Sequence, residues 1–182
     1  CAAKLSNQDA AFLLSDFIRQ YPVHAFVPQA HYHLGMYYFS TKQYKKVLEQ
    51  FYEIDERVVN KDDLAEFRFK KGYSYFATGK YAEAKALLKQ SSEENGPYHY
   101  RALYYLAHMA YSDKQYEAAL EDFQKLQNVP EYKDEVQQYL MQIYFLQEQY
   151  DKVVAMAPSV MTENNLKNQP ELYRTLALSY YN

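Results

Sequence analysis

The chain has 182 residues, of which 48% are hydrophobic and 24% charged, so it holds enough apolar material for a packed core and is not intrinsically disordered. Its net charge of -3 provides no positive field that would attract nucleic acid. One cysteine excludes an internal disulfide framework and a cysteine-based zinc site, and no apolar run approaches the roughly 18 residues of a membrane span.

A tyrosine recurs in matched settings along the chain. It is Tyr44 in KQYKKVLEQF, Tyr81 in GKYAEAKALL, Tyr116 in KQYEAALEDF and Tyr150 in EQYDKVVAMA, at separations of 37, 35 and 34 residues. A second signal precedes each of these tyrosines, namely HLGMYY, KKGYSY, YLAHMA and YLMQIY. Repetition at this period is typical of a solenoid, in which each repeat packs on its neighbours.

Apolar residues recur at helical spacing within each repeat, which predicts two helices joined by a tight turn. One first helix is expected to begin at DLAE, where Asp63 can cap it and Glu66 can reach back. In the fourth repeat, Pro158 falls inside the second helix, so we expect that helix to end or bend near Ala157. The other first helices are expected to begin near prolines, which the first helical turn tolerates: Pro28, Pro97, Pro130 and Pro170.

The order of these residues resembles the tetratricopeptide repeat (TPR) family, over essentially the whole chain. The resemblance implies an all-α, right-handed superhelical solenoid of antiparallel helix pairs, with four full units and a half unit at each end. The expected units are about 1–26 (partial), 27–61, 62–96, 97–130, 131–166 and 167–182 (partial). The matching residues include Leu34, Gly35, Tyr38, Tyr44, Val47 and Phe51; Gly72, Tyr75, Gly79, Tyr81, Ala84 and Leu88; Leu106, Ala107, Tyr116, Ala119 and Phe123; and Leu140, Tyr144, Tyr150 and Val153.

Both ends of the sequence read as incomplete repeats. The last segment, ELYRTLALSYYN, has the pattern of a first helix without its partner helix, so we expect a piece of a longer array whose uncapped C-terminal end allows self-association. Cys1 stands where a mature bacterial lipoprotein carries its lipid. The stretch FIRQYPVHAFVPQAHYHLGMYYF also resembles the TPR lipoprotein of the bacterial outer-membrane assembly machinery. That resemblance favours the bacterial periplasm or cell envelope over the cytoplasm.

The sequence contains no grouping that predicts catalysis, a cofactor or a metal. His31 and His33 are two residues apart, about 200° around a helix, and cannot share an ion from one face. No glycine-rich phosphate loop or nucleophile elbow is present. An RNA-binding helical repeat of similar period is disfavoured, because acidic residues outnumber basic ones.

In TPR arrays the first helices line a concave groove, and the resemblance places aromatic residues there. One groove position is aromatic in every unit, which has two interpretations: packing between helices, or rigid anchors for a partner segment. Glu66 and Glu135 occupy another groove position. The expected partner-binding residues are Tyr32, Met36, Phe39, Phe69, Tyr73, Phe76, Tyr104, His108, Tyr111, Gln142 and Phe145.

The predicted function is a non-catalytic module that binds a protein or peptide segment in this groove. Two alternatives stay open: an architectural spacer within a larger multi-repeat bacterial protein, and a lipid-anchored envelope assembly factor. Exposure of the aromatic position would favour binding, and burial by neighbouring helices would favour the spacer. A carboxylate clamp of the chaperone-adaptor type is disfavoured, because Tyr32, Phe69 and Tyr104 occupy positions that carry lysines and asparagines in those adaptors.

Overall fold

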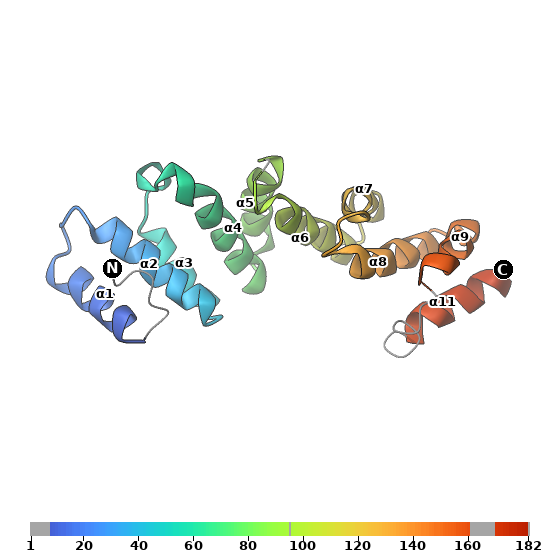
Figure 1. The fold of residues 1–182 in the computed structure, drawn as a ribbon, viewed down its shortest axis with the longest axis horizontal. Helices are drawn as coiled ribbons and strands as arrows, with labels where there is room; N and C mark the ends of the chain where they lie inside the picture. The colour runs from blue at the N-terminus through green and yellow to red at the C-terminus, as the bar shows by residue number, and fades with distance from the viewer. Residues whose placement is uncertain (1–7, 95, 161–169, 182) are drawn as a thin grey trace. The chain divides into compact units, whose positions relative to one another are not determined.

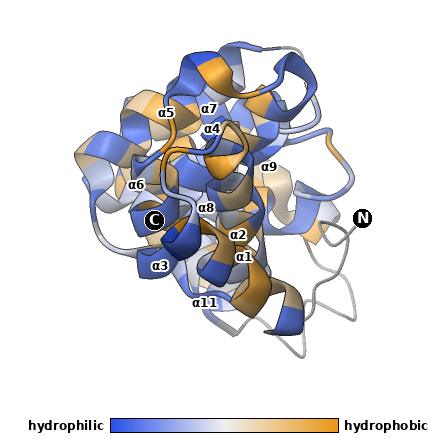
Figure 2. Ribbon diagram, turned by 90° about the vertical axis from the view of Figure 1, so that its left-hand side faces the viewer, coloured by the Kyte–Doolittle hydropathy of each residue, from blue (hydrophilic) through white to orange (hydrophobic). Residues whose placement is uncertain are grey.

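The computed structural model describes residues 8–94, 96–160 and 170–181 (Figure 1). Within these ranges every regular element is a helix, which confirms the predicted all-α fold. The chain forms two compact units, residues 1–102 and 103–182, and the boundary between them falls within one helix. Most helices carry hydrophilic and hydrophobic residues side by side, as amphipathic helices do (Figure 2).

In the first unit the helices pack in succession, α1 on α2, α2 on α3, α3 on α4 and α4 on α5. A short 3₁₀ helix, η2, lies between α3 and α4. Each second helix therefore lies between its own first helix and the next repeat. The bounds are α1 (Gln8–Gln20), α2 (Val27–Ser40), α3 (Tyr44–Tyr52), η2 (Glu56–Val58), α4 (Lys61–Ala77) and α5 (Tyr81–Glu93).

The second unit repeats this arrangement. Helix α7 packs on α8, α8 packs on α9, and α11 packs on both α8 and α9. Leu103 and Ala107 of α6 share a buried core with Ala119 and Phe123 of α7. The bounds are α6 (His99–Ser112), which begins in the first unit, α7 (Tyr116–Leu126), α8 (Lys133–Leu146), α9 (Tyr150–Val160) and α11 (Pro170–Tyr181).

The same tight turn joins the two helices of each full pair. After α2, the backbone N–H of Gln43 donates to the carbonyl of Tyr38 at 2.9 Å, and Lys42 adopts a left-handed conformation with φ 58°. This is the bond of a Schellman turn, which satisfies carbonyls at the end of a helix. The equivalent bonds join Lys80 to Tyr75, Gln115 to Ala110 and Gln149 to Tyr144, and the equivalent left-handed residues are Gly79, Lys114 and Glu148.

The repeat positions predicted to be small or apolar form the core. Each large apolar side chain that is fully buried stabilises the folded state by roughly 1.5–3 kcal/mol. At Gly35, a Cβ atom would overlap the ring of Phe51, so only glycine allows α2 and α3 to approach this closely. The residues that are 0% exposed at matching positions are Val47, Ala84, Ala119 and Val153, followed one helical turn later by Phe51, Leu88 and Phe123.

The structure corrects two local predictions, the cap of α4 and the end of α9 at Ala157. Helix α4 begins earlier than expected, with Asn60 as its N-cap, so Asp63 lies in the first turn and does not cap the helix. Helix α9 continues to Val160 in spite of Pro158. A proline removes one backbone bond but keeps a φ that suits a helix, and the buried side chains of Ala157 and Val160 hold the last turn against Leu176. Cys1 lies outside the described residues.

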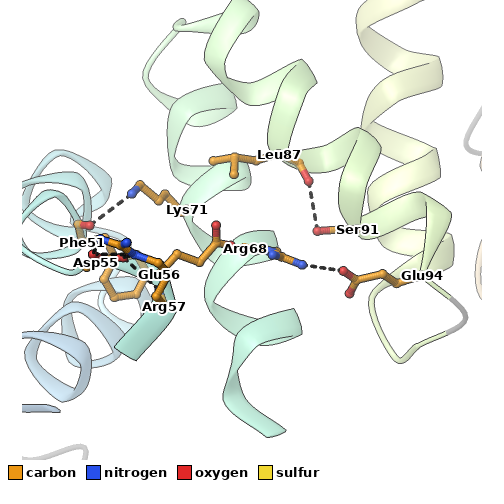
Figure 3. Close-up of polar contacts among 9 residues, drawn as sticks. All are labelled: Phe51, Asp55, Glu56, Arg57, Arg68, Lys71, Leu87, Ser91 and Glu94. Carbon is orange, nitrogen blue, oxygen red and sulfur yellow. Dashed lines mark hydrogen bonds and ion pairs between the residues drawn. The ribbon is translucent and has the colours of Figure 1, made fainter. Parts of the chain in front are cut away.

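Charged side chains hold α4 to the loops on both sides of its helix pair (Figure 3). The Arg68 guanidinium contacts the Glu56 carboxylate and donates to Oε1 of Glu94 at 2.6 Å. Lys71 Nζ donates to the carbonyl of Phe51 at 3.1 Å, at the C-terminal end of α3, where a cation is favoured by the helix dipole. Burial lowers the pKa of Lys71. These contacts fix the spacing of successive helices.

In the part of the chain that the structure describes, no helix is both long enough and apolar enough to cross a bilayer.

Candidate protein-interaction surface

In the first unit, α2 and α4 bring the predicted groove residues to one face. Helix α2 supplies Tyr32, Met36 and Phe39, and α4 supplies Phe69, Tyr73 and Phe76 at matching positions. Tyr32 and Phe69 are buried, with 9% and 5% of their surface exposed, and the other four are half-buried. The two helices therefore form one continuous surface that is largely aromatic.

The rings of this first-unit face cover one another. Phe39 meets Tyr73 edge-on with 5.6 Å between ring centroids, and Tyr44 meets Tyr73 edge-on at 5.3 Å. The ammonium group of Lys70 lies 5.0 Å from the Phe39 ring centroid, a cation–π contact. Edge-to-face pairs restrict ring orientation, so these contacts limit how the rings of the face can turn.

A carboxylate organises the other end of this face. Glu66 forms an ion pair with Lys70 at 2.7 Å. Burial, and then the Glu66 carboxylate, raise the pKa of Tyr98 to about 12 and raise the pKa of Tyr32 as well. Phe69 stacks on Tyr98 with 4.9 Å between centroids. Glu66 thus places a carboxylate beside two tyrosines whose hydroxyl pKa values are raised.

In the second unit, α6 and α8 form the corresponding face. The hydroxyl of Tyr111 donates to Oε1 of Gln142 at 2.9 Å. Tyr111 and His108 both meet the ring of Tyr139 edge-on, at 5.1 Å and 5.9 Å. Phe145, the remaining predicted residue of α8, is half-buried like Tyr111, His108 and Gln142.

Tyr104 repeats the relationship that Tyr32 has with Glu66. It stacks on Tyr132 with 5.3 Å between centroids. Burial is the largest cause that raises the pKa of Tyr104, and the Glu135 carboxylate of the next first helix is another. Glu66 and Glu135 occupy matching repeat positions. In each of the two compact units, one carboxylate therefore lies beside the tyrosine of the preceding first helix.

The position that is aromatic in every repeat has a constant partner. In each helix pair, its ring contacts the tyrosine that begins the second helix. The centroid distances are 5.7 Å for Phe39 with Tyr44, 5.9 Å for Phe76 with Tyr81, 5.9 Å for Tyr111 with Tyr116 and 5.7 Å for Phe145 with Tyr150. These rings pack across the tight turns, and the residue at the constantly aromatic position is half-buried in each pair.

Sequence reasoning missed several residues of these faces. Tyr139 was not among the predicted groove residues, and its ring stacks on the buried Phe123 with 4.6 Å between centroids. Tyr98 precedes α6 and Lys70 follows Phe69, and both join the first-unit face. Their aromatic or basic character was visible in the sequence, but helical spacing alone did not reveal which neighbour each side chain meets.

The histidines make individual contacts. Nδ1 of His31 lies 3.0 Å from Oε1 of Gln50, and Nδ1 of His99 lies 2.6 Å from the carbonyl oxygen of Ser92. Burial is the main cause that lowers the pKa of His33. Among the described residues, no three His, Cys, Asp or Glu side chains lie close enough to hold a metal ion.

Residues 69–133 match the family model of the tetratricopeptide repeat. Solved structures of MamA share the fold. MamA AMB-1 is 16% identical with a TM-score of 0.70, over 87% of this chain and 83% of that one. MamA MSR-1 is 16% identical with a TM-score of 0.64, over 86% of each chain. A MamA RS-1 double mutant is 17% identical with a TM-score of 0.61, over 96% of this chain and 85% of that one. No curated protein matches the sequence.

Proposed function

Because residues 69–133 match the tetratricopeptide repeat model and the chain shares its fold with MamA structures, we propose that it is a non-catalytic interaction module that binds a segment of a partner protein on its first-helix faces. In the first unit the binding face consists of α2 and α4, with the half-buried Met36, Phe39 and Tyr73 on its surface and the buried Tyr32 and Phe69 beneath them. In the second unit it consists of α6 and α8.

The observation that carries the proposal is the variety at one groove position. Met36, Tyr73, His108 and Gln142 occupy this position in successive repeats, and all four are half-buried. The neighbouring position, by contrast, holds an aromatic ring in each repeat and contacts a tyrosine each time. A position that only packed helices together would be served by one kind of side chain, whereas a position that selects a partner benefits from different chemistries.

The arrangement suits binding at low entropic cost. Side chains such as Tyr73 and Tyr111 are already held by contacts with neighbouring helices, so little rotamer freedom is lost when a partner segment arrives. Glu66 and Glu135 provide hydrogen-bond acceptors beside the rings. Aromatic side chains with adjacent polar groups are typical anchors of protein interfaces.

A second candidate function is the architectural spacer, and one observation favours it. The ring at the constantly aromatic position is half-buried against its own helix pair, as in Phe76 with Tyr81. That ring alone is therefore a poor anchor. If the whole face were covered by other repeats, the chain would serve only to space its neighbours.

Site-specific photo-crosslinking distinguishes these functions. Benzoylphenylalanine replaces Met36 or Gln142 on the first-helix faces, and Lys85 or Ala118 on exposed second-helix surfaces as controls. In the native cell we expect one protein partner to be captured from the face positions and not from the controls. Crosslinks that are only intramolecular would support the spacer, and equal capture at the control positions would contradict the proposed faces.

A further inference from the structure

The first unit contains an open cleft on a side of α4 other than the proposed binding face. It is an open cleft of about 530 Å³ between α3 and the C-terminal end of α4. Tyr75, which lines it, follows Tyr73 by two residues and so lies about 200° away around the helix. The cleft is therefore separate from the face proposed above. Helix α3 contributes Lys45, Leu48, Glu49 and Tyr52 to its wall, and Glu53 follows directly at the end of the helix.

The floor of the cleft is apolar and accessible. Tyr52 is 79% exposed, which is unusual for so large a side chain on a helix packed at both sides. Leu48 and Tyr75 are half-buried beside it. Tyr52 contributes to the raised pKa of Tyr75, after burial and Glu83. The volume matches pockets that accept a few side chains or a small ligand.

The rim of the cleft carries a row of charged side chains. Lys45, Glu49 and Glu53 follow one another at intervals of four residues, so they form one row along α3. Lys and Glu at this spacing often pair, yet none of the three has an ion-pair partner among the residues that the structure describes. The row is positive at its N-terminal end and negative over its next two turns. Lys80, across the cleft, covers the Tyr75 ring with 5.8 Å between its ammonium group and the centroid.

We infer that this cleft is a second docking site, which binds an amphipathic α-helix of a partner protein. The helix would seat one large apolar side chain on Tyr52 and Tyr75. Two basic residues one turn apart would face Glu49 and Glu53, and an acidic residue would face Lys45. A helix fits better than an extended strand, because its i, i+4 spacing matches the charge row on α3 and its ridges fit a groove between helices.

The test uses a phage-displayed library of helical peptides, selected on the intact chain. Peptides that share the pattern of two basic residues and one apolar residue should be enriched. Their affinity should fall about tenfold or more on Tyr52→Ala, because the anchor ring is lost. It should also fall on the charge reversal Glu49→Lys/Glu53→Lys. Selection on that reversed chain should instead enrich acidic residues at the two basic positions.

A matched control keeps the test specific. The variant Glu93→Lys/Glu121→Lys makes the same change in net charge at exposed positions outside the cleft, and should bind the selected peptides as the unmodified chain does. Circular dichroism checks that every variant is folded. Enrichment without the charge pattern, no enrichment at all, or equal loss on the control would overturn the inference. None of these outcomes bears on the first-helix faces, because the photo-crosslinking positions lie elsewhere.

Discussion

The hydroxyl of Tyr111 donates a hydrogen bond to Oε1 of Gln142 at 2.9 Å, and so joins the first helices of two successive repeats. Both residues are half-buried, and both belong to the proposed binding face. The side chains that would meet a partner therefore also hold neighbouring repeats together, which links binding to the rigidity of the array.

We expect Tyr111→Phe to lower the free energy of unfolding by about 1 kcal/mol, because Gln142 loses its donor in a partly dry site. A double-mutant cycle with Gln142→Met, measured by urea denaturation, isolates the pair. Tyr116→Phe is the control, since its hydroxyl has no hydrogen-bond partner within the described ranges. Additive effects of Tyr111→Phe and Gln142→Met would show that this hydrogen bond contributes nothing to stability in solution.

Replacement of Gly79 by alanine tests the tight turns. Gly79 adopts φ 77°, and an added Cβ meets no atom within 4 Å, so backbone strain is the only cost. Gly79→Ala should lower the free energy of unfolding by about 1 kcal/mol. Gly96→Ala is the matched control, because its Cβ also meets nothing and its φ is not left-handed. The midpoint of thermal unfolding should be lower for Gly79→Ala than for Gly96→Ala. Equal midpoints for the two variants would contradict the turn geometry.

The contact of Arg68 with two loops predicts a salt-dependent stability. Arg68→Ala should lower the free energy of unfolding by about 1 kcal/mol, because Glu56 and Glu94 lose a shared cation that is only 23% exposed. The loss should shrink in concentrated salt, which screens the remaining charges. Arg57→Ala removes an exposed ion pair with Asp55 and should leave the midpoint of chemical denaturation unchanged. A similar loss in both variants would mean that bridging two loops adds nothing.

The shielded tyrosines predict loss of stability in alkali. The pKa of Tyr98 is raised to about 12, first by burial and then by Glu66, and burial with Tyr73 raises the pKa of Tyr44 to about 12. An unfolded tyrosine titrates near 10. Between pH 10 and about 12 the unfolded chain therefore loses protons that the folded chain keeps, and the free energy of unfolding falls as pH rises.

Carbon NMR of labelled tyrosine rings, with circular dichroism, measures this titration. In Glu66→Gln the pKa of Tyr98 should move down, because a nearby negative charge is removed. Glu49→Gln should leave the pKa of Tyr98 in place, because Glu49 is not among the groups that shift it. A Tyr98 that titrates near 10 in the folded chain would show that the ring is solvated.

Much of the fold could be predicted from single residues and their spacing. The small and large positions of the repeat, such as Val47 and Phe51, recur at one period and are buried in each full pair. Local details were less predictable. Helix α4 begins with Asn60 and not Asp63 at its N-cap position. Helix α9 passes through Pro158, because packing of whole helices outweighs the preference of one residue.

For the proposed binding faces, the sequence by itself determined which residues share a side of each first helix, because helical geometry fixes that from spacing alone. Only the tertiary structure decided what each side chain meets. The bond of Tyr111 to Gln142, the stacking of Tyr139 on Phe123, the position of Arg68 between two loops and the cleft beside Tyr52 all arise where different helices come together. Their distances depend on how bulky side chains from separate segments fit into one another, which no periodicity within a single segment records.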